Sequence, residues 1–246
     1  MTDTPADDQK PSFRSDITVE LVKHTASDAD VLFAARVSTV GEQSLEELEK
    51  DPARSKGLIN FLMRDRHGSP FEHNSMTFFI SAPIFVFREF MRHRVGWSYN
   101  EESGRYRQLE PVFYVPDESR KLVQQGRPGK YVFVEGTRAQ QELVGRAMED
   151  SYRQAYAAYL EMLEAGVARE VARSVLPVGM FSSMYATCNA RSLMHFLGLR
   201  TQHELAAVPS FPQREIEMVG QAMEQHWEQL MPLTHAAFNA NGRVAP

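Results

Sequence analysis

The sequence predicts a protein of mixed α-helix and β-strand that folds as a single domain. Apolar residues recur at the spacing of amphipathic helices over several stretches, and the longest of these runs from Ala139 to Ala165. Short apolar runs between them indicate buried strands, as at Met180 to Cys188. No repeat, low-complexity tract or linker divides the 246 residues, a length within the range of one domain. These patterns predict the class of fold but not the order of the strands.

The N-terminal part of the chain is predicted to be a flexible tail followed by a strand and a helix. Residues 1–15 are rich in polar residues and Pro and have little to bury, so we expect a tail at 1–15 and one folded domain at 16–246. Apolar and polar residues alternate from Ile17 onward, which is typical of a strand. Ser27 or Asp28 can then cap the helix that follows.

Two helices separated by a buried strand are predicted next. The first covers residues 45–67 and has a restart where Asp51 can cap and Pro52 can occupy the first helical position. Ser75 to Ile80 is apolar enough for a buried strand. The second helix is expected from Ile84 to about Arg94, because its apolar residues lie on one face.

The second half of the chain alternates in the same way between helical and extended patterns. Prolines, glycines and an asparagine cap mark the ends of these segments. The predicted elements are a strand at 111–116, a surface segment at 117–138, helices at 139–165 and 169–176, a strand at 180–188, a helix after Asn189, a loop at 202–213 and a last helix at 215–230.

The composition excludes several classes of protein. The formal net charge of −5 argues against a general nucleic-acid binder, which is usually basic. The single cysteine, Cys188, excludes a disulfide framework. No run approaches the ~20 apolar residues of a membrane span, and the polar segment from Met1 to Lys10 does not resemble a secretory signal. We expect a reduced, cytoplasmic setting with no membrane or nucleic-acid partner.

The stretch from Arg92 to Arg107 suggests a ligand site, because it interleaves Arg, His, Glu, Ser and Asn with Trp and Tyr. Guanidinium groups bind phosphate and carboxylate through paired hydrogen bonds and also stack on flat rings. Ser103, Gly104 and their backbone amides can approach an anion closely. We therefore expect a nucleotide-phosphate site beside a flat aromatic ligand.

The three consecutive residues Arg92, His93 and Arg94 would spread over about 200° on a helix, so they cannot all face one ligand. We expect the helix to end here and Gly96 to lead the chain into a loop that forms the site. The alternative for either arginine alone is a cation that complements the dipole of a helix C-terminus.

The order of residues in this stretch resembles the signature of the flavin-dependent thymidylate synthases. That signature is Arg-His-Arg, two residues, Ser, four residues, Ser, one residue, Arg. Here Arg92-His93-Arg94 is followed by the three-residue spacer Val95-Gly96-Trp97, which is one residue longer than in the signature. From Ser98 to Arg105 the internal spacing matches.

Two further blocks are similar to elements of the same family. His67-Gly68-Ser69-Pro70-Phe71-Glu72-His73 is similar to its upstream element, and Asn189 to Met194, followed by Leu199-Arg200, is similar to its downstream element. The blocks stand in the family's order, and the resemblance extends roughly from Ile17 to Arg200.

The resemblance implies an α+β fold with an antiparallel sheet of about four strands flanked by helices, and a flavin site outside a Rossmann frame. The sequence contains neither Gly-x-Gly-x-x-Gly nor a Walker-type loop, which agrees with the latter. The implied reaction is the reductive methylation of dUMP to dTMP. FAD is the implied cofactor, with NADPH as its reductant and 5,10-methylenetetrahydrofolate as the carbon donor. A homotetramer with shared flavin sites is also implied.

The resemblance also assigns site residues by position. Those expected to bind dUMP are Glu89, Arg92, Glu101, Glu102, Ser103, Gly104, Arg105, Arg173 and Arg200. Those expected to bind FAD are His67, Ser69, Glu72, Arg92, His93, Arg94, Glu101, Asn189, Arg191 and His195. No metal site is expected.

Each assignment has a simpler structural alternative. Arg200 is the expected catalytic residue, because a cation at the uracil edge makes the ring more electron-rich; its alternative is a surface arginine at a helix end. Arg173 has Glu170 close on the same predicted helix, so a salt bridge is the alternative. Glu89 can either contact the nucleotide or pair with Arg92 or His93 along its helix.

The remaining candidates have alternatives of the same kind. Asn189 could be a plain N-cap, which would leave Arg191 unexplained. His195 stands where some relatives carry Asn, and either can hydrogen-bond a flavin carbonyl. Cys188 lies in a predicted buried strand, so we expect a small apolar residue and not a nucleophile.

Two other functions are compatible with parts of the sequence. The first is a nucleotide-binding regulator without chemistry, built on the same Arg/Ser/Gly stretch. The second is a metal-dependent hydrolase that uses His67, Glu72, His73 and His93, although their spacing is not that of a His-Glu-x-x-His zinc motif. A bound flavin would separate the first from the synthase, and metal content would separate the second.

Overall fold

The computed structural model describes residues 10–41 and 52–246. The strands are β1 (Ser12–Arg14), β2 (Thr18–His24), β3 (Met76–Pro83), β4 (Trp97–Glu101), β5 (Val112–Tyr114), β6 (Val123–Arg127), β7 (Lys130–Val134) and β8 (Phe181–Cys188). The α-helices are α1 (Asp28–Val40), α3 (Pro52–Arg64), α4 (Ile84–Phe90), α5 (Arg138–Glu164), α6 (Arg169–Ala172), α7 (Ala190–Arg200), α8 (Arg214–Leu230) and α9 (Pro232–Ala240). Short 3-10 helices occupy Ser69–Glu72 and Arg173–Val175. Of the described helices, none is long and apolar enough to cross a membrane.

The chain forms two compact units, each assembled from segments that are distant in the sequence. The first unit contains the described parts of Met1–Asp16, Ser81–Arg88 and Glu101–Ser183. The second contains the described parts of Ile17–Ile80, Glu89–Asn100 and Met184–Pro246. The division into a tail at 1–15 and one domain at 16–246 stays a prediction. Ser12–Arg14, however, forms β1, so the prediction of a flexible tail is wrong for these residues.

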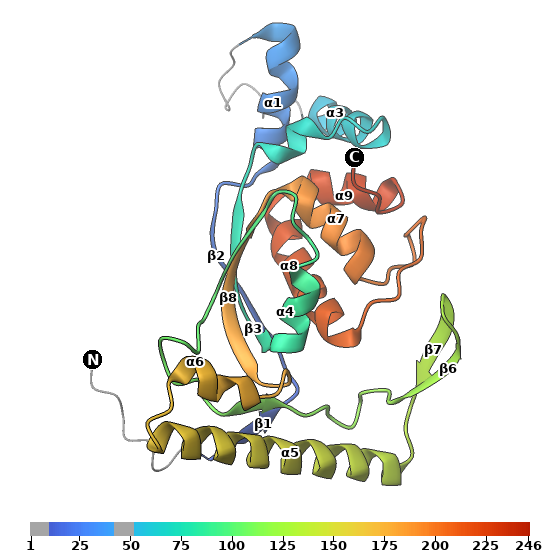
Figure 1. Ribbon diagram of the computed structural model, residues 1–246. Coiled ribbons are helices and arrows are strands. Elements are labelled where there is room, and N and C mark those ends of the chain that lie inside the picture. Colours follow the sequence, from blue (N-terminus) through green and yellow to red (C-terminus); the bar gives the residue numbers. More distant parts are fainter. Residues whose placement is uncertain (1–9, 42–51) are drawn as a thin grey trace. The chain divides into compact units, whose positions relative to one another are not determined.

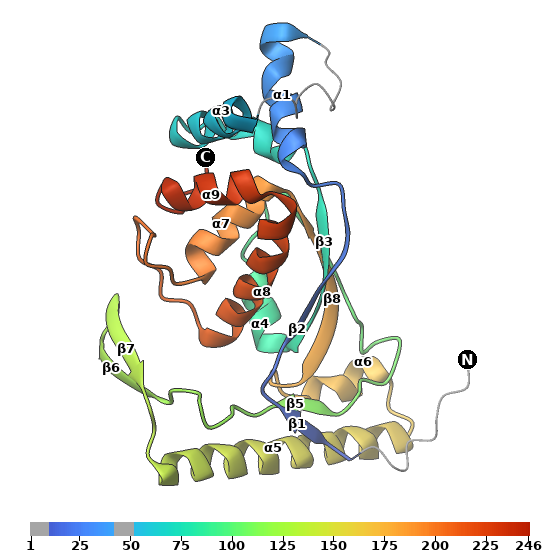
Figure 2. The same ribbon diagram turned by 180° about the vertical axis from the view of Figure 1, so that it is seen from behind.

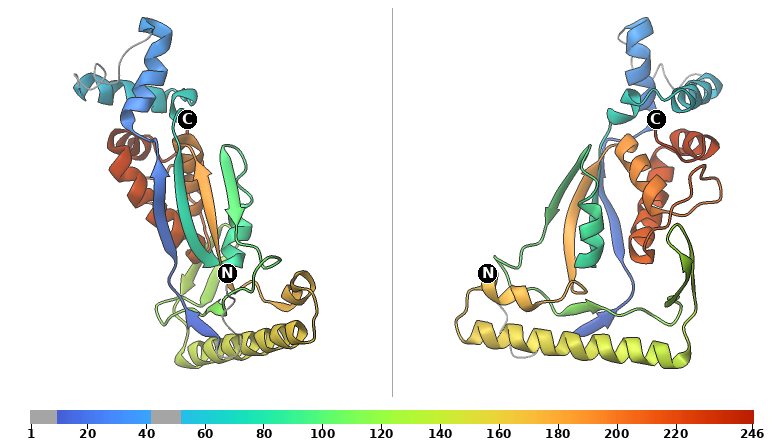
Figure 3. Two further views of the ribbon diagram at one scale, coloured as in Figure 1. Left: turned by 90° about the vertical axis from the view of Figure 1, so that its left-hand side faces the viewer. Right: turned by 45° about the vertical axis from the view of Figure 1, so that its right-hand side comes forward.

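A four-stranded antiparallel sheet dominates the second unit, with the strand order β2-β3-β8-β4. The left-hand view of Figure 3 shows these strands side by side. The hydroxyl groups of Thr77 on β3 and Thr187 on β8 lie 2.9 Å apart and add a side-chain bond between the two central strands. The predicted α+β class and its four-stranded antiparallel sheet are therefore confirmed.

Helices α7 and α8 cover one face of this sheet, as Figure 1 shows. Helix α8 carries Ile216, Val219, Met223 and Trp227 on one face, and all four side chains are fully buried. Phe196 of α7 is also fully buried. This core holds α7, which carries several of the predicted site residues, against the sheet.

The first unit is organised around the long helix α5, whose buried residues are Tyr152, Tyr156 and Tyr159. Thr137 caps this helix and shares a capping box with Gln140, as polar residues at such a start predict. Figure 2 shows β1 and β5 running beside α5. The two strands pair in parallel, and the ring of Phe113 on β5 stacks on that of Tyr152 with centroids 4.9 Å apart.

The segment predicted as a featureless surface excursion at 117–138 contains an antiparallel hairpin. In this hairpin of β6 and β7, Val123 lies opposite Val134 and Arg127 lies opposite Lys130. Gly129 adopts a φ of 76° in the turn, a conformation that glycine reaches at little cost. The hairpin was missed because β6 contains Gln-Gln-Gly-Arg and lacks the apolar alternation of a half-buried strand.

Other boundaries follow the sequence closely. The cap at Ser27, the start at Pro52, the cap at Asn189 and the end of α5 before Gly166 are confirmed. The predicted cap at Asp51 and the helical residues before it lie outside the described residues. Helix α9 was not predicted.

Candidate active site

The predicted site stretch begins differently from the expectation, because α4 ends at Phe90, before Arg92. The chain then turns, and Gly96 takes a φ of 70°, as expected for the residue that releases it. Trp97–Glu101 forms the edge strand β4, so the predicted loop is wrong for these residues. Pairing with β8 gives these five residues a rigid backbone.

In the second unit, Arg200 contacts two predicted site residues. Its Nη1 donates to Oε2 of Glu89 at 2.5 Å, and its Nε donates to Nε2 of His93 at 3.1 Å. Glu89 therefore pairs with a residue at the end of α7, and not with its own helical neighbours. The two residues lie 111 positions apart in the sequence, so spacing alone does not predict this contact.

The surroundings set the charges of this group, which we call the Arg200 group (Glu89, His93 and Arg200). Burial and then the nearby cation of Arg200 lower the pKa of His93 to about 4, so its ring is neutral near pH 7 and accepts the bond from Nε. Burial raises the pKa of Glu89 despite the opposing effect of Arg200. The other carboxylate oxygen, Glu89 Oε1, is buried and has no hydrogen-bond partner among the described residues. An unpartnered buried acceptor of this kind indicates a place for a ligand donor.

Aromatic residues and one tyrosine hydroxyl hold His93 in position. Tyr99 donates to the backbone oxygen of Phe90 at 3.1 Å and to that of His93 at 2.9 Å. Its ring stacks on Trp97 with centroids 5.6 Å apart, and the His93 ring lies edge-on to Phe196 at 4.9 Å. Trp97 thus packs within the protein. Tyr99 was not predicted as a site residue, and only its place inside the signature stretch could have indicated its role.

The longer spacer at Val95-Gly96-Trp97 fits against the start of α7. The hydroxyl of Ser192 donates to the backbone oxygen of Val95 at 3.0 Å. A Cβ built on Gly96 would lie 2.1 Å from that hydroxyl and 3.2 Å from Nδ2 of Asn189. Gly96 therefore allows both the turn and the close approach of the chain to α7.

The start of α7 brings together three residues predicted to bind the flavin. Asn189 caps the helix by accepting from the Ser192 amide at 2.9 Å. Arg191 donates from Nη1 to Glu72 at 2.5 Å and from Nε to the backbone oxygen of Pro246 at 2.6 Å. Its Nη2 has no hydrogen-bond partner within the described residues, so this donor can reach a ligand.

The other predicted flavin residues lie less close together. His67 is exposed and its ring stacks on Phe61, with centroids 5.6 Å apart. Ser69 is exposed at the start of its 3-10 helix. His195 lies four residues after Arg191 on α7, and burial, followed by the cation of Arg191, lowers its pKa.

Arg92 and Arg94 are exposed, and within residues 10–41 and 52–246 neither guanidinium group makes a hydrogen bond or ion pair. Unpaired guanidinium groups at adjacent turns are suited to an anionic ligand.

In the first unit, Ser103, Gly104 and Arg105 form a turn after β4. The Ser103 hydroxyl accepts from the Arg105 amide at 3.3 Å. Arg105 Nε pairs with Glu170 at 2.8 Å, although both side chains are at least half exposed. Glu170 is therefore the partner of Arg105, and the alternative in which it pairs with Arg173 is not realised.

Arg173 and two glutamates lie close to this turn. A Cβ on the buried Gly104 would lie 3.0 Å from Leu109 and 3.4 Å from the Arg173 side chain. Partial burial of the carboxyl group raises the pKa of Glu101. A hydrogen bond from Ser182 and the cation of Arg173 act in the opposite direction. Glu102 pairs with Arg107 at 3.2 Å. These residues form one cluster with Arg173, whose exposed guanidinium group has no hydrogen bond or ion pair with the rest of the described chain.

The single cysteine does not join either group. Cys188 is buried at the end of β8, and burial raises the pKa of its thiol well above the usual range. A thiolate nucleophile is therefore disfavoured at this position. Within the described residues, no three His, Cys, Asp or Glu side chains gather in a way that could hold a metal ion.

The chain is similar to a well-defined set of known proteins. A family model described as thymidylate synthase complementing protein matches residues 20–233. A flavin-dependent thymidylate synthase from Streptomyces avermitilis is 87% identical over 246 residues, which is 100% of both chains. Another from Tropheryma whipplei is 59% identical over 236 residues, covering 96% of this chain and 98% of the relative.

Solved structures agree with these matches. The crystal structure of a UMP/dUMP methylase, PolB, from Streptomyces cacaoi bound with 5-Br dUMP has a TM-score of 0.89 and 56% identity. The similarity covers 95% of this chain and 99% of that one.

The four-stranded antiparallel sheet is not a Rossmann frame, and the matched proteins are flavin-dependent synthases and a nucleotide methylase. The chain belongs to the family of the flavin-dependent thymidylate synthases. It is an FAD-dependent methyltransferase of dTMP synthesis, with folate and NADPH as co-substrates. The matches support neither the regulator nor the metal-dependent hydrolase.

The residues present fit a flavin dinucleotide. The free Nη2 of Arg191 and the unpaired guanidinium groups of Arg92 and Arg94 provide donors for phosphates or ring carbonyls. Gly68 is buried, and a Cβ there would lie 2.5 Å from the Arg191 guanidinium, so the chain is built to let that group sit close to the backbone.

Proposed function

We propose that this chain methylates dUMP reductively to dTMP, with Arg200 as the catalytic residue that polarises the pyrimidine. The Arg200 group carries this proposal, since its cation is held by a neutral histidine and by a carboxylate with one unpartnered oxygen. A bound flavin would supply the hydride after reduction by NADPH, and methylenetetrahydrofolate would supply the carbon.

The role of Arg200 is electrostatic. A fixed cation beside the uracil ring stabilises negative charge that develops on it, and a group ordered in advance does so without reorganising. Glu89 and His93 keep the guanidinium in one orientation. The unpartnered Oε1 of Glu89 is proposed to accept an N–H of the nucleotide, which would satisfy its buried lone pairs.

In the first unit, we propose that Ser103, Gly104, Arg105 and Arg173 bind the phosphate of dUMP. A hydroxyl, backbone amides and two guanidinium groups are a suitable donor set for a dianion. Glu101 and Glu102 are proposed as acceptors for hydroxyl or N–H groups of the nucleotide. Binding requires Arg105 to exchange the exposed carboxylate of Glu170 for phosphate. This exchange costs little free energy, because exposed ion pairs contribute little to stability.

The proposed flavin residues carry hydrogen-bond donors or acceptors that suit a dinucleotide. They are His67, Ser69, Glu72, Arg92, His93, Arg94, Glu101, Asn189, Arg191 and His195. In the second unit, Arg191 is the best supported of them, because Glu72 orders its guanidinium while Nη2 stays available.

A homotetramer with shared flavin sites and a cytoplasmic location are further proposals that rest on the family. Light scattering of the purified protein would measure the mass of the assembly, and a monomer at micromolar concentration would contradict the tetramer.

The function is tested by the visible spectrum of the purified protein, recorded before and after anaerobic NADPH and then dUMP. We expect flavin bands that NADPH bleaches and that dUMP perturbs. UMP should be tested in parallel, because PolB is named as a methylase of both nucleotides. If added FAD does not bind to a protein purified without colour, the proposal fails.

The assignment of Arg200 is tested with Arg200→Ala, and Arg214→Ala serves as an exposed arginine control on α8. Loss of a preorganised electrostatic group is expected to lower kcat by about 10²-fold or more while FAD stays bound. The control should keep normal turnover. A near-normal rate in Arg200→Ala would refute its catalytic role.

A further inference from the structure

Resting on the proposed function, we propose that residues 243–246, here called the C-terminal strap, position both ends of α7 for the reaction. The strap bonds to the second residue of α7 and to the residue that ends it. These ends carry Arg191 and Arg200, which are the proposed flavin-binding and catalytic arginines. Arg243, the first residue of the strap, is the positioning residue.

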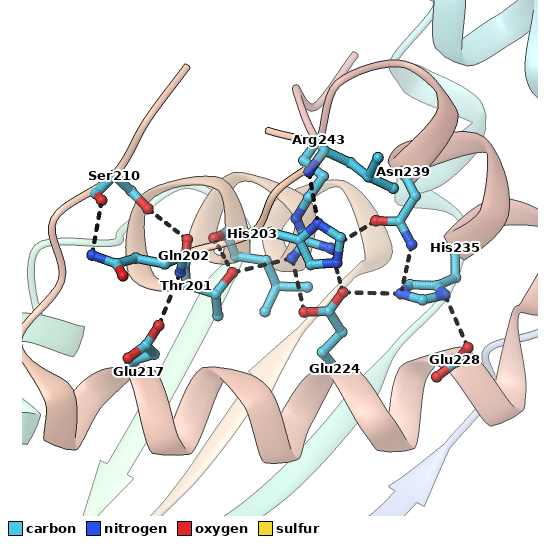
Figure 4. Close-up of polar contacts among 12 residues, drawn as sticks. Thr201, Gln202, His203, Ser210, Glu217, Glu224, Glu228, His235, Asn239 and Arg243 are labelled. Atoms are coloured by element: carbon cyan, nitrogen blue, oxygen red, sulfur yellow. Dashed lines mark hydrogen bonds and ion pairs between the residues drawn. The ribbon is translucent and has the colours of Figure 1, made fainter. Parts of the chain in front are cut away.

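Arg243 is held by a network of buried polar contacts, drawn in Figure 4. Its side chain is 1% exposed and forms two bonds with Glu224, at 2.6 and 2.8 Å. It also donates to Oδ1 of Asn239 at 2.7 Å. The backbone at Arg243 has a φ of 55°, which is uncommon for a residue other than glycine and persists where the surroundings determine it.

The network has the character of a fixed support. Burial opposes ionisation of Glu224, but hydrogen bonds from Arg243 and His235 outweigh it and lower the pKa of Glu224 to about 2. His235 lies 2.9 Å from the same carboxylate and 3.5 Å from Glu228. A paired, hydrogen-bonded ion pair of this kind is held in one geometry. It fixes the strap relative to α8 and α9.

At the C-terminal end of α7, the strap contacts the residue next to Arg200. Nη2 of Arg243 donates to Oγ1 of Thr201 at 3.1 Å, and that hydroxyl donates to the backbone oxygen of Leu197 at 2.7 Å. A Cβ on Gly198 would lie 3.1 Å from the backbone oxygen of Arg243, so the strap lies close against the helix. The last turn of α7, from which Arg200 projects, is thereby held by the strap.

At the N-terminal end of α7, the strap contacts Arg191 directly. The backbone oxygen of Pro246 accepts from Arg191 Nε at 2.6 Å, and that of Val244 accepts from Arg66 at 2.5 Å. Together with Glu72, Pro246 occupies two nitrogens of the Arg191 guanidinium and leaves Nη2 directed elsewhere. The strap therefore sets the orientation of this arginine before any ligand arrives.

The test uses changes that leave the ion pair of Arg243 and Glu224 intact, since removing one partner of a buried pair can unfold a protein. Thr201→Val removes the hydroxyl at one end, and Thr201→Ser restores it. A chain that ends at Val244 removes the Pro246 oxygen at the other end. Asn241→Ala is the matched control, because its side chain bonds to Asn60 and to the Ala237 backbone and not to α7.

We expect the two changes to affect different properties of the FAD-loaded enzyme. In Thr201→Val, kcat should fall by about tenfold or more with FAD affinity unchanged, because a small misplacement of a catalytic group is costly. Thr201→Ser should recover most of the rate. The chain ending at Val244 should bind FAD about tenfold more weakly, since a charge-assisted bond that orders Arg191 is lost. Normal kcat in Thr201→Val, or equal losses in Asn241→Ala, would overturn the proposal.

Hydrogen–deuterium exchange of the same proteins provides a readout that does not depend on catalysis. Faster exchange at the C-terminal turn of α7 in Thr201→Val, and at its first turn in the shortened chain, is expected. If the unaltered protein bound no FAD, the proposed function would fail. The exchange rates would still test whether the strap orders the two ends of α7. Unchanged exchange in both variants would contradict the proposal that the strap positions α7.

Discussion

The ring of His93 is kept neutral by its place in the fold. Burial and the cation of Arg200 lower its pKa to about 4 from an ordinary value of 6.5. The unfolded chain therefore binds a proton between these two values when the folded protein does not. The stability that the neutral ring contributes is present above pH 6.5 and is lost as the pH falls toward 4.

We predict that His93→Gln flattens the pH dependence of stability in this window. Urea unfolding is measured from about pH 7.5 to about pH 4.5. Over this range the free energy of unfolding should fall by about 1–3 kcal/mol more in the unaltered protein than in the variant. Screening of the charges by solvent would bring the difference toward the lower figure. Parallel curves for the two proteins would mean that His93 titrates at its ordinary pKa in the folded protein.

Cys188 is a second residue whose environment decides its chemistry. Because its thiol is buried with a raised pKa, Cys188→Ala should keep turnover within about threefold of normal and cost about 1 kcal/mol of stability through the small cavity. Turnover and urea unfolding measure the two effects. A folded, flavin-loaded variant without activity would reopen a mechanism based on a protein thiolate.

At the scale of elements, the stretch from Arg92 to Arg107 is a turn, a strand and a second turn. Tyr99 on β4 ties this strand to the turn that carries His93. Gly96 then lets the turn pass close to the start of α7, where Ser192 bonds to Val95. The three-residue spacer is accommodated by this contact, which the linear signature does not reveal.

We predict opposite effects for two Gly→Ala changes in the second unit. Gly96→Ala forces a Cβ to 2.1 Å from Ser192 at a positive φ, and should destabilise the protein by about 2 kcal/mol or more. Gly57→Ala lies in the exposed interior of α3 with nothing within 4 Å, and should stabilise it by about 0.5–1 kcal/mol. Urea unfolding of both variants measures the difference. A neutral Gly96→Ala would show that the turn can move away from α7.

At the scale of the whole molecule, cofactor binding and stability are linked. A ligand that binds only the folded protein at 100 times its Kd adds about 2.7 kcal/mol, and each kcal/mol raises Tm by about 2–4 °C for a chain of this length. FAD should therefore raise Tm of the apo-protein by about 5–10 °C.

The same experiment tests Arg191. Arg191→Ala should reduce the FAD-dependent rise in Tm by several degrees, because a tenfold weaker affinity removes about 1.4 kcal/mol. Arg214→Ala, with a salt bridge to Glu217 on the surface, should keep the full rise. Thermal unfolding followed by circular dichroism measures both. An equal rise in all three proteins would exclude Arg191 from the flavin contacts.

The sequence by itself determined the features that depend on local rules. Caps at Ser27 and Asn189, the glycine end of α5 and the apolar faces of α5 and α8 follow from side chains within a few residues of one another. The signature stretch likewise predicted the family, because the fixed spacing of its polar and charged side chains can be recognised in the sequence.

Only the tertiary structure decided which of these side chains meet. Glu89 lies 111 positions from Arg200, and Arg191 lies 55 positions from Pro246. Such pairs depend on how helices pack on a sheet, and no periodicity in the sequence encodes them. The same holds for the positive φ of Arg243 and for the buried network around Glu224. Both features depend on contacts between segments that are distant in the sequence.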